Sequence, residues 1–301
     1  MSEHHHDHHH HHVSGKNLFI TILLNIIITV AQIIGGIVSG SLALLSDAMH
    51  NFSDVLSLVI AYGANRLSSK PSNAEKTFGY HRAEILAALF NSSVLIGISI
   101  YLIIEAFGKL YHPQPIDSTW VIALGTLGIV VNALSVWMVK EDAEENMNLQ
   151  AAYLHLLADV MTSIAVVVGG VLMYYFHIFW IDPVISIFIA LYLLWASFGL
   201  VKGATFVLMQ FVPKGINLND VMKTIIAVPQ IENAHHIHLW QLDDHRIHLE
   251  AHLDFNENIT IEASNLIIDI LEKQLEELFK ISHVTFQCEY NRCNSKEIVK
   301  I

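Results

Sequence analysis

Charged side chains are scarce in this 301-residue chain, since Asp, Glu, Lys and Arg make up only 15% of it against 53% hydrophobic residues. Soluble domains carry about 25% charged residues, so the shortage argues against an ordinary cytosolic globule and against a disordered chain. The formal net charge is -12 at pH 7, and this excess of acid predicts no binding to nucleic acid. A mean hydropathy of +0.47 is instead typical of a membrane protein.

Cysteine is also rare, because the chain contains only Cys288 and Cys293, both near its end. Two such cysteines predict no disulfide framework. The sequence has no G-x-x-x-x-G-K-[ST] loop and no phosphorylation motif of an ATPase, which argues against a process driven by ATP. It also lacks H-E-x-x-H, a zinc-binding pattern of metalloproteases. Histidine, in contrast, is abundant at 20 residues, and neutral imidazole is a common metal ligand.

Residues 1–12 read MSEHHHDHHHHH and hold eight of the 20 histidines. Two interpretations stay open, namely an expression tag and a natural tail that collects metal ions, in which Asp7 interrupts the histidines. The apolar run that follows is too long for a secretory signal peptide and shows no small-residue cleavage site. We therefore assign residues 1–15 to a histidine-rich tail.

Six apolar segments follow, each near the ~20 residues that a helix needs to cross a bilayer. They run over residues 17–38, 42–67, 84–110, 118–139, 149–176 and 182–208. Basic residues concentrate after the second, fourth and sixth segments, as Arg66, Lys140 and Lys214 illustrate. The positive-inside bias then predicts that both termini are cytoplasmic. Residues 16–210 are thus expected to form a six-helix transmembrane domain in a lipid bilayer.

Pro213 and Gly215 mark a change of composition, after which the chain becomes more polar. Hydrophobic periodicity predicts, in order, a helix, two strands, a helix and a final strand. Their expected bounds are 217–227, 234–242, 246–255, 260–279 and 283–290. This αββαβ order is typical of a small α+β domain of the ferredoxin or metallochaperone kind. We place that cytoplasmic domain at 211–293 and leave 294–301 as a tail.

Ionisable side chains lie within two of the apolar segments, where they are costly and usually functional. The pattern H-x-x-x-D-V occurs at His50 and Asp54 and again, 105 residues later, at His155 and Asp159. Residues i and i+4 share one face of a helix, so two facing helices would offer two imidazoles and two carboxylates. Such a set suits tetrahedral Zn²⁺, although paired structural polar residues are the alternative. Asp47 is either a further ligand or a partner in local hydrogen bonds.

The stretches SDAMHNFSD, FGYHRAEIL and HLLAD, together with six spans followed by an αββαβ domain, resemble the cation diffusion facilitator family over residues 14–293. The resemblance is closest to its zinc-transporting branch and implies that His50, Asp54, His155 and Asp159 hold the transported ion. It further implies a homodimer, located in a bacterial inner membrane, that exports divalent cations from the cytoplasm in exchange for protons. Zinc is the expected substrate, with cobalt or cadmium as companions, and no organic cofactor is expected.

Seven histidines follow Pro213, and the strand pairing decides which of them meet. A two-residue turn at Asp243-Asp244 would set His235 opposite His252, whereas a turn one residue longer would set His236 there. The family resemblance favours His235 and His252 as ligands of a regulatory zinc ion. The full predicted cytoplasmic set is His235, His252, His283, Glu289 and Cys288. A solvated polar sheet face, or a dimer contact, is the alternative interpretation.

The expected mechanism is alternating access around the four-ligand membrane site. Metal ligands must lose protons before they bind an ion, so protons and Zn²⁺ would compete for the same groups. Three alternatives stay open. They are a membrane-bound zinc sensor, a passive divalent-cation channel, and an intramembrane zinc hydrolase, for which four protein ligands would leave no open position on the metal.

Overall fold

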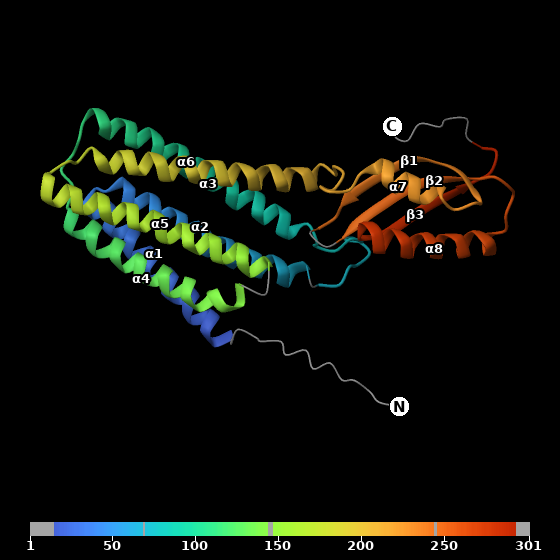
Figure 1. Cartoon of the computed structure of the whole chain (residues 1–301), viewed down its shortest axis with the longest axis horizontal. Helices are drawn as coiled ribbons and strands as arrows, with labels where there is room; N and C mark the ends of the chain where they lie inside the picture. Colours follow the sequence, from blue (N-terminus) through green and yellow to red (C-terminus); the bar gives the residue numbers. More distant parts are fainter. Residues whose placement is uncertain (1–14, 69, 144–146, 244–245, 293–301) are drawn as a thin grey trace. The chain divides into compact units, whose positions relative to one another are not determined.

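The structure is a computed structural model that describes residues 15–68, 70–143, 147–243 and 246–292. Its helices and strands follow the predicted order, six long helices and then a helix, two strands, a helix and a strand (Figure 1). The long helices are α1 Gly15–Ser39, α2 Leu42–Ser68, α3 Ala83–Tyr111, α4 Ser118–Ala143, α5 Met147–Phe176 and α6 Ile181–Leu208. The predicted fold class, a helical membrane part followed by a small α+β domain, is confirmed. Residues 1–14 of the predicted histidine-rich tail and the tail of 294–301 lie outside the described residues, and Gly15 begins α1.

Four stretches among the described residues are long and apolar enough to cross a membrane by length and composition. They are Ala83–Tyr111, Ser118–Trp137, Leu156–Phe176 and Ile181–Leu208. Helix α1 contributes a shorter apolar stretch, Asn25–Ser39, among the residues whose side chains are described. Helix α2 is less apolar because it contains Asp47, His50 and Asp54, the residues that the sequence singles out as functional.

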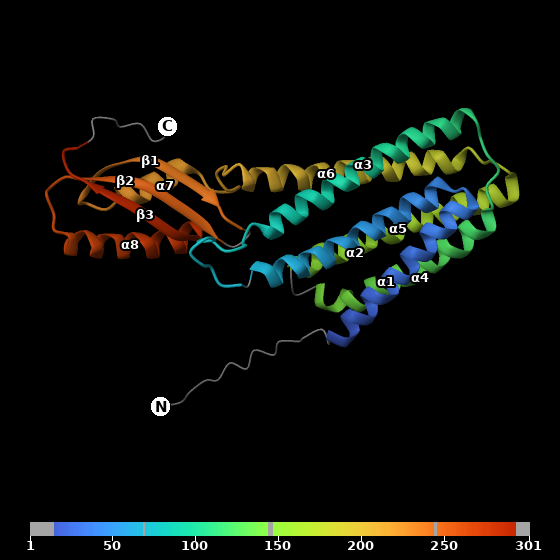
Figure 2. The same cartoon turned by 180° about the vertical axis from the view of Figure 1, so that it is seen from behind.

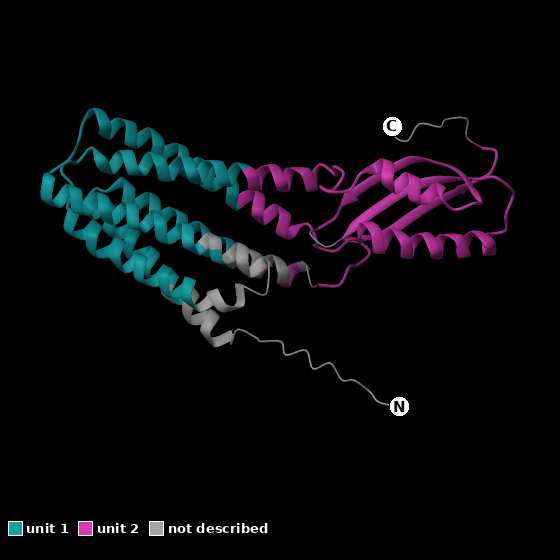
Figure 3. Ribbon diagram, viewed as in Figure 1, with its two compact units in different colours: residues 1–59, 91–198 teal, residues 60–90, 199–301 magenta. Residues whose placement is uncertain are grey.

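The chain divides into two compact units (Figure 3). Helices α1, α4 and α5 lie in the first unit, whereas α2, α3 and α6 each contribute residues to both. The first comprises residues 1–59 and 91–198, and the second comprises residues 60–90 and 199–301. In the first unit, α4 packs against both α1 and α5, and the views from both sides show these helices running side by side (Figures 1 and 2). An apolar core in this unit is built by α2, α4, α5 and α6, and it includes the buried side chains Leu44, Val121, Val166, Met173 and Leu193.

The start of α2 is bound to the start of α6 by a buried carboxylate. Gly40 has a φ of 73° in the left-handed region, which glycine tolerates and which lets the chain turn between α1 and α2. Asp182 of α6 is 0% exposed and accepts hydrogen bonds from the Ser41 hydroxyl and from the backbone N–H groups of Leu42 and Ala43. An anion at a helix N-terminus satisfies the free N–H groups and the helix dipole, so this contact fixes where α2 begins.

The α+β domain is a three-stranded sheet covered by two helices. Its elements are α7 Leu218–Ile226, β1 Ile231–Gln241, β2 Ile247–Phe255, α8 Ile261–Phe279 and β3 Ile281–Glu289. The strand order is β1-β2-β3, antiparallel between β1 and β2 and parallel between β2 and β3. Alternate residues of the strands meet the inner face of α8 in one apolar core, which contains Ile237, Leu249, Leu253, Leu271 and Leu275.

The register between β1 and β2 results from two opposing shifts. The Leu242 N–H donates to the Arg246 carbonyl, so the turn is the longer of the two predicted alternatives, which alone would set His236 opposite His252. An irregularity between His235 and His238 then moves the register back by one residue. His235 therefore pairs with His252 after all, although the two-residue turn that would have produced this pairing is absent from the described hairpin.

Candidate metal sites

Three of the four residues predicted for the membrane site lie together in the first unit. His50 and Asp54 share one face of α2, and Asp159 faces them from α5. The His50 Nε2 atom is 2.7 Å from Asp159 Oδ1 and 3.7 Å from Asp54 Oδ2. One ligand atom from each residue lies within 4.8 Å of the other two. Ligands of a tetrahedral zinc ion are roughly 3.3–3.6 Å apart for bonds of about 2.0–2.2 Å, so small movements would admit an ion.

The members of this cluster differ in how deeply they are buried. His50 is 5% exposed and Asp159 is 4% exposed, whereas the Asp54 side chain is 38% exposed. The cluster is therefore largely enclosed by protein, and Asp54 is its most exposed member. Residue 155 belongs to α5, one turn before Asp159, but the side chain of His155 lies outside the described part of the structure. Its place in the predicted set stays a prediction.

A second cluster gathers on the sheet, at the end where β2 and β3 finish. His235 Nδ1 is 3.3 Å from Asp254 Oδ2, and His235 Nε2 is 3.6 Å from Glu289 Oε2. His252 Nδ1 is 3.1 Å from Glu289 Oε1. Among the described residues, both ring nitrogens of His235 and Oε2 of Glu289 are buried without a hydrogen bond. Buried polar atoms normally have hydrogen-bond partners, so these three atoms are suited to coordinate a cation.

The irregularity in β1 adds His236 to this cluster. His236 has a φ of 50°, a left-handed conformation that is uncommon for residues other than glycine and often marks functional sites. Its ring centroid lies 5.0 Å from that of His235 and 4.7 Å from that of His252. Strict strand alternation would have sent His236 to the other face. Neither His236 nor Asp254 belongs to the predicted ligand set, although strand alternation puts Asp254 on the same face of β2 as His252.

The structure does not bring His283 or Cys288 to this cluster. His283 is at the start of β3, where it pairs with His248 and the two ring centroids are 4.9 Å apart. Glu289 lies six positions further along β3, which corresponds to roughly 20 Å at about 3.3 Å per residue. Cys288 precedes Glu289 and therefore points to the opposite face. Burial raises the pKa of the Cys288 thiol, against a weaker opposing hydrogen bond with Ser264, so the thiolate needed for metal binding is disfavoured.

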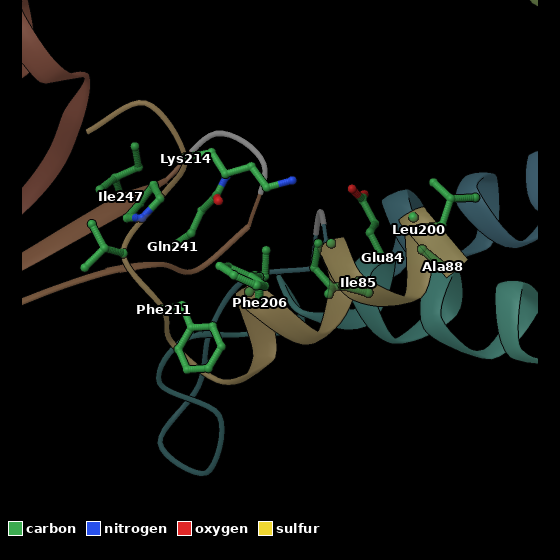
Figure 4. Close-up of a pocket in the computed structure, with 15 residues that line it drawn as sticks. Glu84, Ile85, Ala88, Leu200, Phe206, Phe211, Lys214, Gln241 and Ile247 are labelled. Carbon is green, nitrogen blue, oxygen red and sulfur yellow. The ribbon is translucent and has the colours of Figure 1, made fainter. Parts of the chain in front are cut away.

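The second unit also contains a cavity of about 500 Å³, but none of the predicted ligands lines it (Figure 4). Its polar groups come from Glu84, Lys214 and Gln241. Its apolar walls include Ile85, Leu200, Phe206, Phe211 and Ile247. A cavity with so few metal-binding groups does not suit an ion, and the chemistry of the molecule therefore concentrates in the two histidine–carboxylate clusters.

Comparison with known proteins covers almost the whole chain. Residues 18–209 match the family described as the cation efflux transmembrane domain, and residues 213–291 match the cation efflux protein cytoplasmic domain. The chain is 36% identical over 280 residues to the cadmium, cobalt and zinc/H(+)-K(+) antiporter of Bacillus subtilis, covering 91% of this chain and 90% of that protein.

Two further relatives cover similar lengths. The metal cation efflux system protein CzcD of Cupriavidus metallidurans is 32% identical over 282 residues, 94% of this chain and 89% of that protein. The zinc transporter ZitB of Escherichia coli is 29% identical over 268 residues, 88% of this chain and 84% of that protein. Both domains and these relatives agree, and the chain therefore belongs to the cation diffusion facilitator family, as a multi-pass membrane transporter that groups with the zinc-transporting members and is not an enzyme.

Proposed function

We propose that the chain is a proton-coupled antiporter that exports divalent cations, chiefly Zn²⁺, from the cytoplasm. The ion binds at His50, Asp54, His155 and Asp159, and alternating access exposes this site first to one side of the membrane and then to the other. The observation that carries the proposal is the cluster of His50, Asp54 and Asp159 on α2 and α5, in which His50 and Asp159 are buried. The name of the Bacillus relative, which includes zinc and protons, supports both the substrate and the coupling.

The chemistry of the cluster supports proton coupling. His50 and Asp159 already share a contact of 2.7 Å, and an ion that binds both must displace any proton held between them. Protons arriving from the opposite side would in turn compete with the ion and release it. A mixed set of imidazole and carboxylate ligands favours zinc and its neighbours over Mg²⁺ and Ca²⁺, which prefer oxygen ligands alone.

Topology and assembly complete the proposal. Basic residues such as Arg66, Lys70 and Lys214 flank the spans on one side, which supports cytoplasmic termini by the positive-inside bias. A bacterial inner membrane agrees with the bacterial relatives. The match of residues 213–291 to the cytoplasmic domain family supports a homodimer, with the lipid bilayer, divalent ions and protons as its other partners.

The decisive experiment measures zinc flux in proteoliposomes with an imposed pH gradient. Residues 1–12 are removed from every variant, so that their histidines cannot bind the ion. We expect flux that follows the gradient in the native sequence and is lost in Asp159→Ala. The matched control is Asp117→Ala, because Asp117 is an exposed carboxylate before α4 and its loss should leave flux unchanged.

The other outcomes identify the alternative functions. Flux that ignores the pH gradient would indicate a passive channel. Zinc binding without flux would favour a membrane-bound sensor. A peptide-cleavage activity that disappears in Asp159→Ala, with no flux in either protein, would favour an intramembrane hydrolase.

The sheet cluster is assigned a regulatory role in the same proposal. His235, His252, Asp254 and Glu289 would hold a Zn²⁺ ion, with His236 close by, when cytoplasmic zinc is abundant. Support comes from the buried His235 nitrogens and the Glu289 oxygen that form no hydrogen bond among the described residues. His283 and Cys288 are left out of this set because the register places them elsewhere.

Calorimetry with both domains present tests this second site. In the Asp159→Ala background, without residues 1–12, we expect one remaining zinc site that Glu289→Gln removes. Cys288→Ser is the matched control, since it alters the neighbouring residue of β3 on the opposite face and should retain the site. Loss of zinc binding in the Cys288→Ser variant alone would contradict the assignment.

A further inference from the structure

Asp47 lies one turn before His50 on α2 and is only 1% exposed. Its Oδ2 atom accepts hydrogen bonds from Gln32 Nε2 at 3.3 Å and from Ser163 Oγ at 3.0 Å. Its Oδ1 atom accepts one from Thr162 Oγ1 at 3.1 Å. A buried carboxylate is costly unless donors satisfy it, and here the donors come from α1 and α5. Both oxygens of Asp47 are thus used by protein hydrogen bonds that join three helices.

The Thr162 hydroxyl connects this arrangement to the transport site. It lies 2.9 Å from the backbone carbonyl oxygen of Asp159, in addition to its contact with Asp47. A hydroxyl has a single proton to donate, so the two acceptors share it. Thr162 and Asp159 both belong to α5. Movement of α5 along α2 would therefore change the contact of Thr162 with Asp47 and the contact of Asp159 with His50 at the same time.

Axial register between α2 and α5 decides the geometry of the transport site. Each residue of a helix adds about 1.5 Å along its axis, whereas a metal site must be held to within about 0.5 Å. A slip of one residue would separate His50 from Asp159 by more than a zinc site tolerates. Asp47 binds two consecutive residues of α5, Thr162 and Ser163, and so opposes this slip.

Helices α1 and α4 also help to hold Asp47 against α5. Gln32 is 0% exposed, and its Oε1 atom accepts a hydrogen bond from Asn51 Nδ2 at 3.2 Å while its amide donates to Asp47. Gly128 of α4 leaves the room that Gln32 occupies, because a Cβ at that position would lie 2.7 Å from Gln32 Nε2. Asp47 therefore accepts hydrogen bonds from Gln32, Thr162 and Ser163, and Asn51 in turn holds the Gln32 amide.

We infer that Asp47 is a positioning residue, which fixes the register of α2 against α5 and thereby sets the preference of the transport site for zinc over larger divalent ions. It acts through Thr162 and Ser163 and does not bind the ion. The inference rests on the transport function proposed above and adds a determinant of its selectivity.

The test compares zinc and cadmium flux in pH-driven proteoliposomes, with residues 1–12 removed. In Asp47→Ala we expect the KM for zinc to rise about 10- to 100-fold, the range found when groups that orient metal ligands are removed. The zinc-to-cadmium ratio of kcat/KM should fall, while kcat for zinc changes less than KM. Thr162→Val keeps the side-chain shape and removes only the hydroxyl, so it should shift KM in the same direction if Asp47→Ala does not fold.

A polar exchange provides the rescue. Asp47→Asn alone places an amide against the amide of Gln32, and the KM for zinc should rise. Combining it with Gln32→Glu restores a carboxylate–amide pair with the same total charge and keeps an acceptor for Asn51. We expect this double variant to recover the native zinc preference, which a residue that binds the ion directly would not do, because the carboxylate has moved to α1.

Ser186→Ala is the matched control. It removes another buried hydrogen bond of α2, the 2.7 Å contact between Ser46 and Ser186, and should leave KM and metal preference unchanged. Native KM and ion preference in Asp47→Ala and Thr162→Val would overturn the inference, as would failure of the double variant to recover. Absence of pH-driven zinc flux in the native sequence would instead refute the proposed transport function.

Discussion

The membrane cluster and the sheet cluster offer the same kinds of ligand, imidazole and carboxylate, but they are assembled in opposite ways. His50 and Asp54 are neighbours on one helix, so their meeting depends only on helical periodicity. His235 and Glu289 lie 54 positions apart in the sequence and meet only through the pairing of three strands. A helical site can therefore be recognised from residue spacing, whereas a sheet site depends on a register that distant residues decide.

The substitution with the largest expected effect tests whether the membrane cluster determines which ion is transported. His50→Asp replaces an imidazole with a carboxylate and makes the set richer in oxygen, which favours harder ions such as Mn²⁺. Zinc flux should fall by at least about tenfold, as expected when a metal ligand or its support is altered, and the ratio of manganese to zinc flux should rise. His112→Asp, at an exposed position, serves as the control. An unchanged flux ratio in His50→Asp would remove the cluster from the ion pathway.

Hydrogen exchange of the full chain, measured with and without zinc, should show whether the sheet cluster binds the ion. A ligand at 100 times its dissociation constant stabilises the bound state by about 2.7 kcal/mol, so exchange near His235 and Glu289 should slow by up to about a hundredfold with zinc. Chelation should reverse this protection. Glu289→Gln should abolish it, and protection that persists in that variant would place the ion elsewhere.

Alkylation of Cys288, measured in a Cys293→Ser background, tests whether Cys288 lies outside the ligand set of the sheet cluster. Burial raises the pKa of the Cys288 thiol above its ordinary value of 9.0. The thiolate is the reactive form, so the pH midpoint of the reaction with iodoacetamide should lie above 9.0. Zinc should not protect this thiol. Strong protection by zinc would return Cys288 to the ligand set.

The smallest expected effect concerns His248, at the other end of the sheet. Burial lowers its pKa below 6.5, His283 and Arg246 lower it further, and Asp243 opposes them. The unfolded chain then binds more protons than the folded one just below pH 6.5, so stability at this site decreases as the pH falls through that window. Exchange of the β2 amides, corrected for intrinsic rates, should accelerate there, and His248→Gln should weaken this pH dependence.

Much of the fold follows from local patterns. The six helices lie within a few residues of the predicted segments, because a bilayer demands long apolar runs whose backbone groups bond internally. The soluble elements are also close to their predicted bounds, since alternation in strands and a 3.6-residue period in helices are local signals. Helical spacing places His50 and Asp54 on one face of α2, whereas Asp159 reaches them only because α5 packs against α2; that these residues hold an ion stays a prediction.

Other features required contacts between distant segments. The strand prediction itself separates His283 from Glu289 by about 20 Å, so spacing alone argues against a shared ion. The identity of the residues that do gather, however, depends on the longer turn, the compensating irregularity at His236 and the parallel pairing of β3. Asp47 illustrates the same limit, because its donors come from two other helices.

The sequence by itself determined the membrane class, the order of the elements and the placement of His50 and Asp54 on one helix face, since each depends on composition or on residues within about one helical turn. Only the tertiary structure decided which histidines meet on the sheet, that Asp254 joins them, and that Asp47 is held by Gln32, Thr162 and Ser163. The physical reason is that strand register and helix packing are set by the summed burial and hydrogen bonding of many distant residues, which no local pattern encodes.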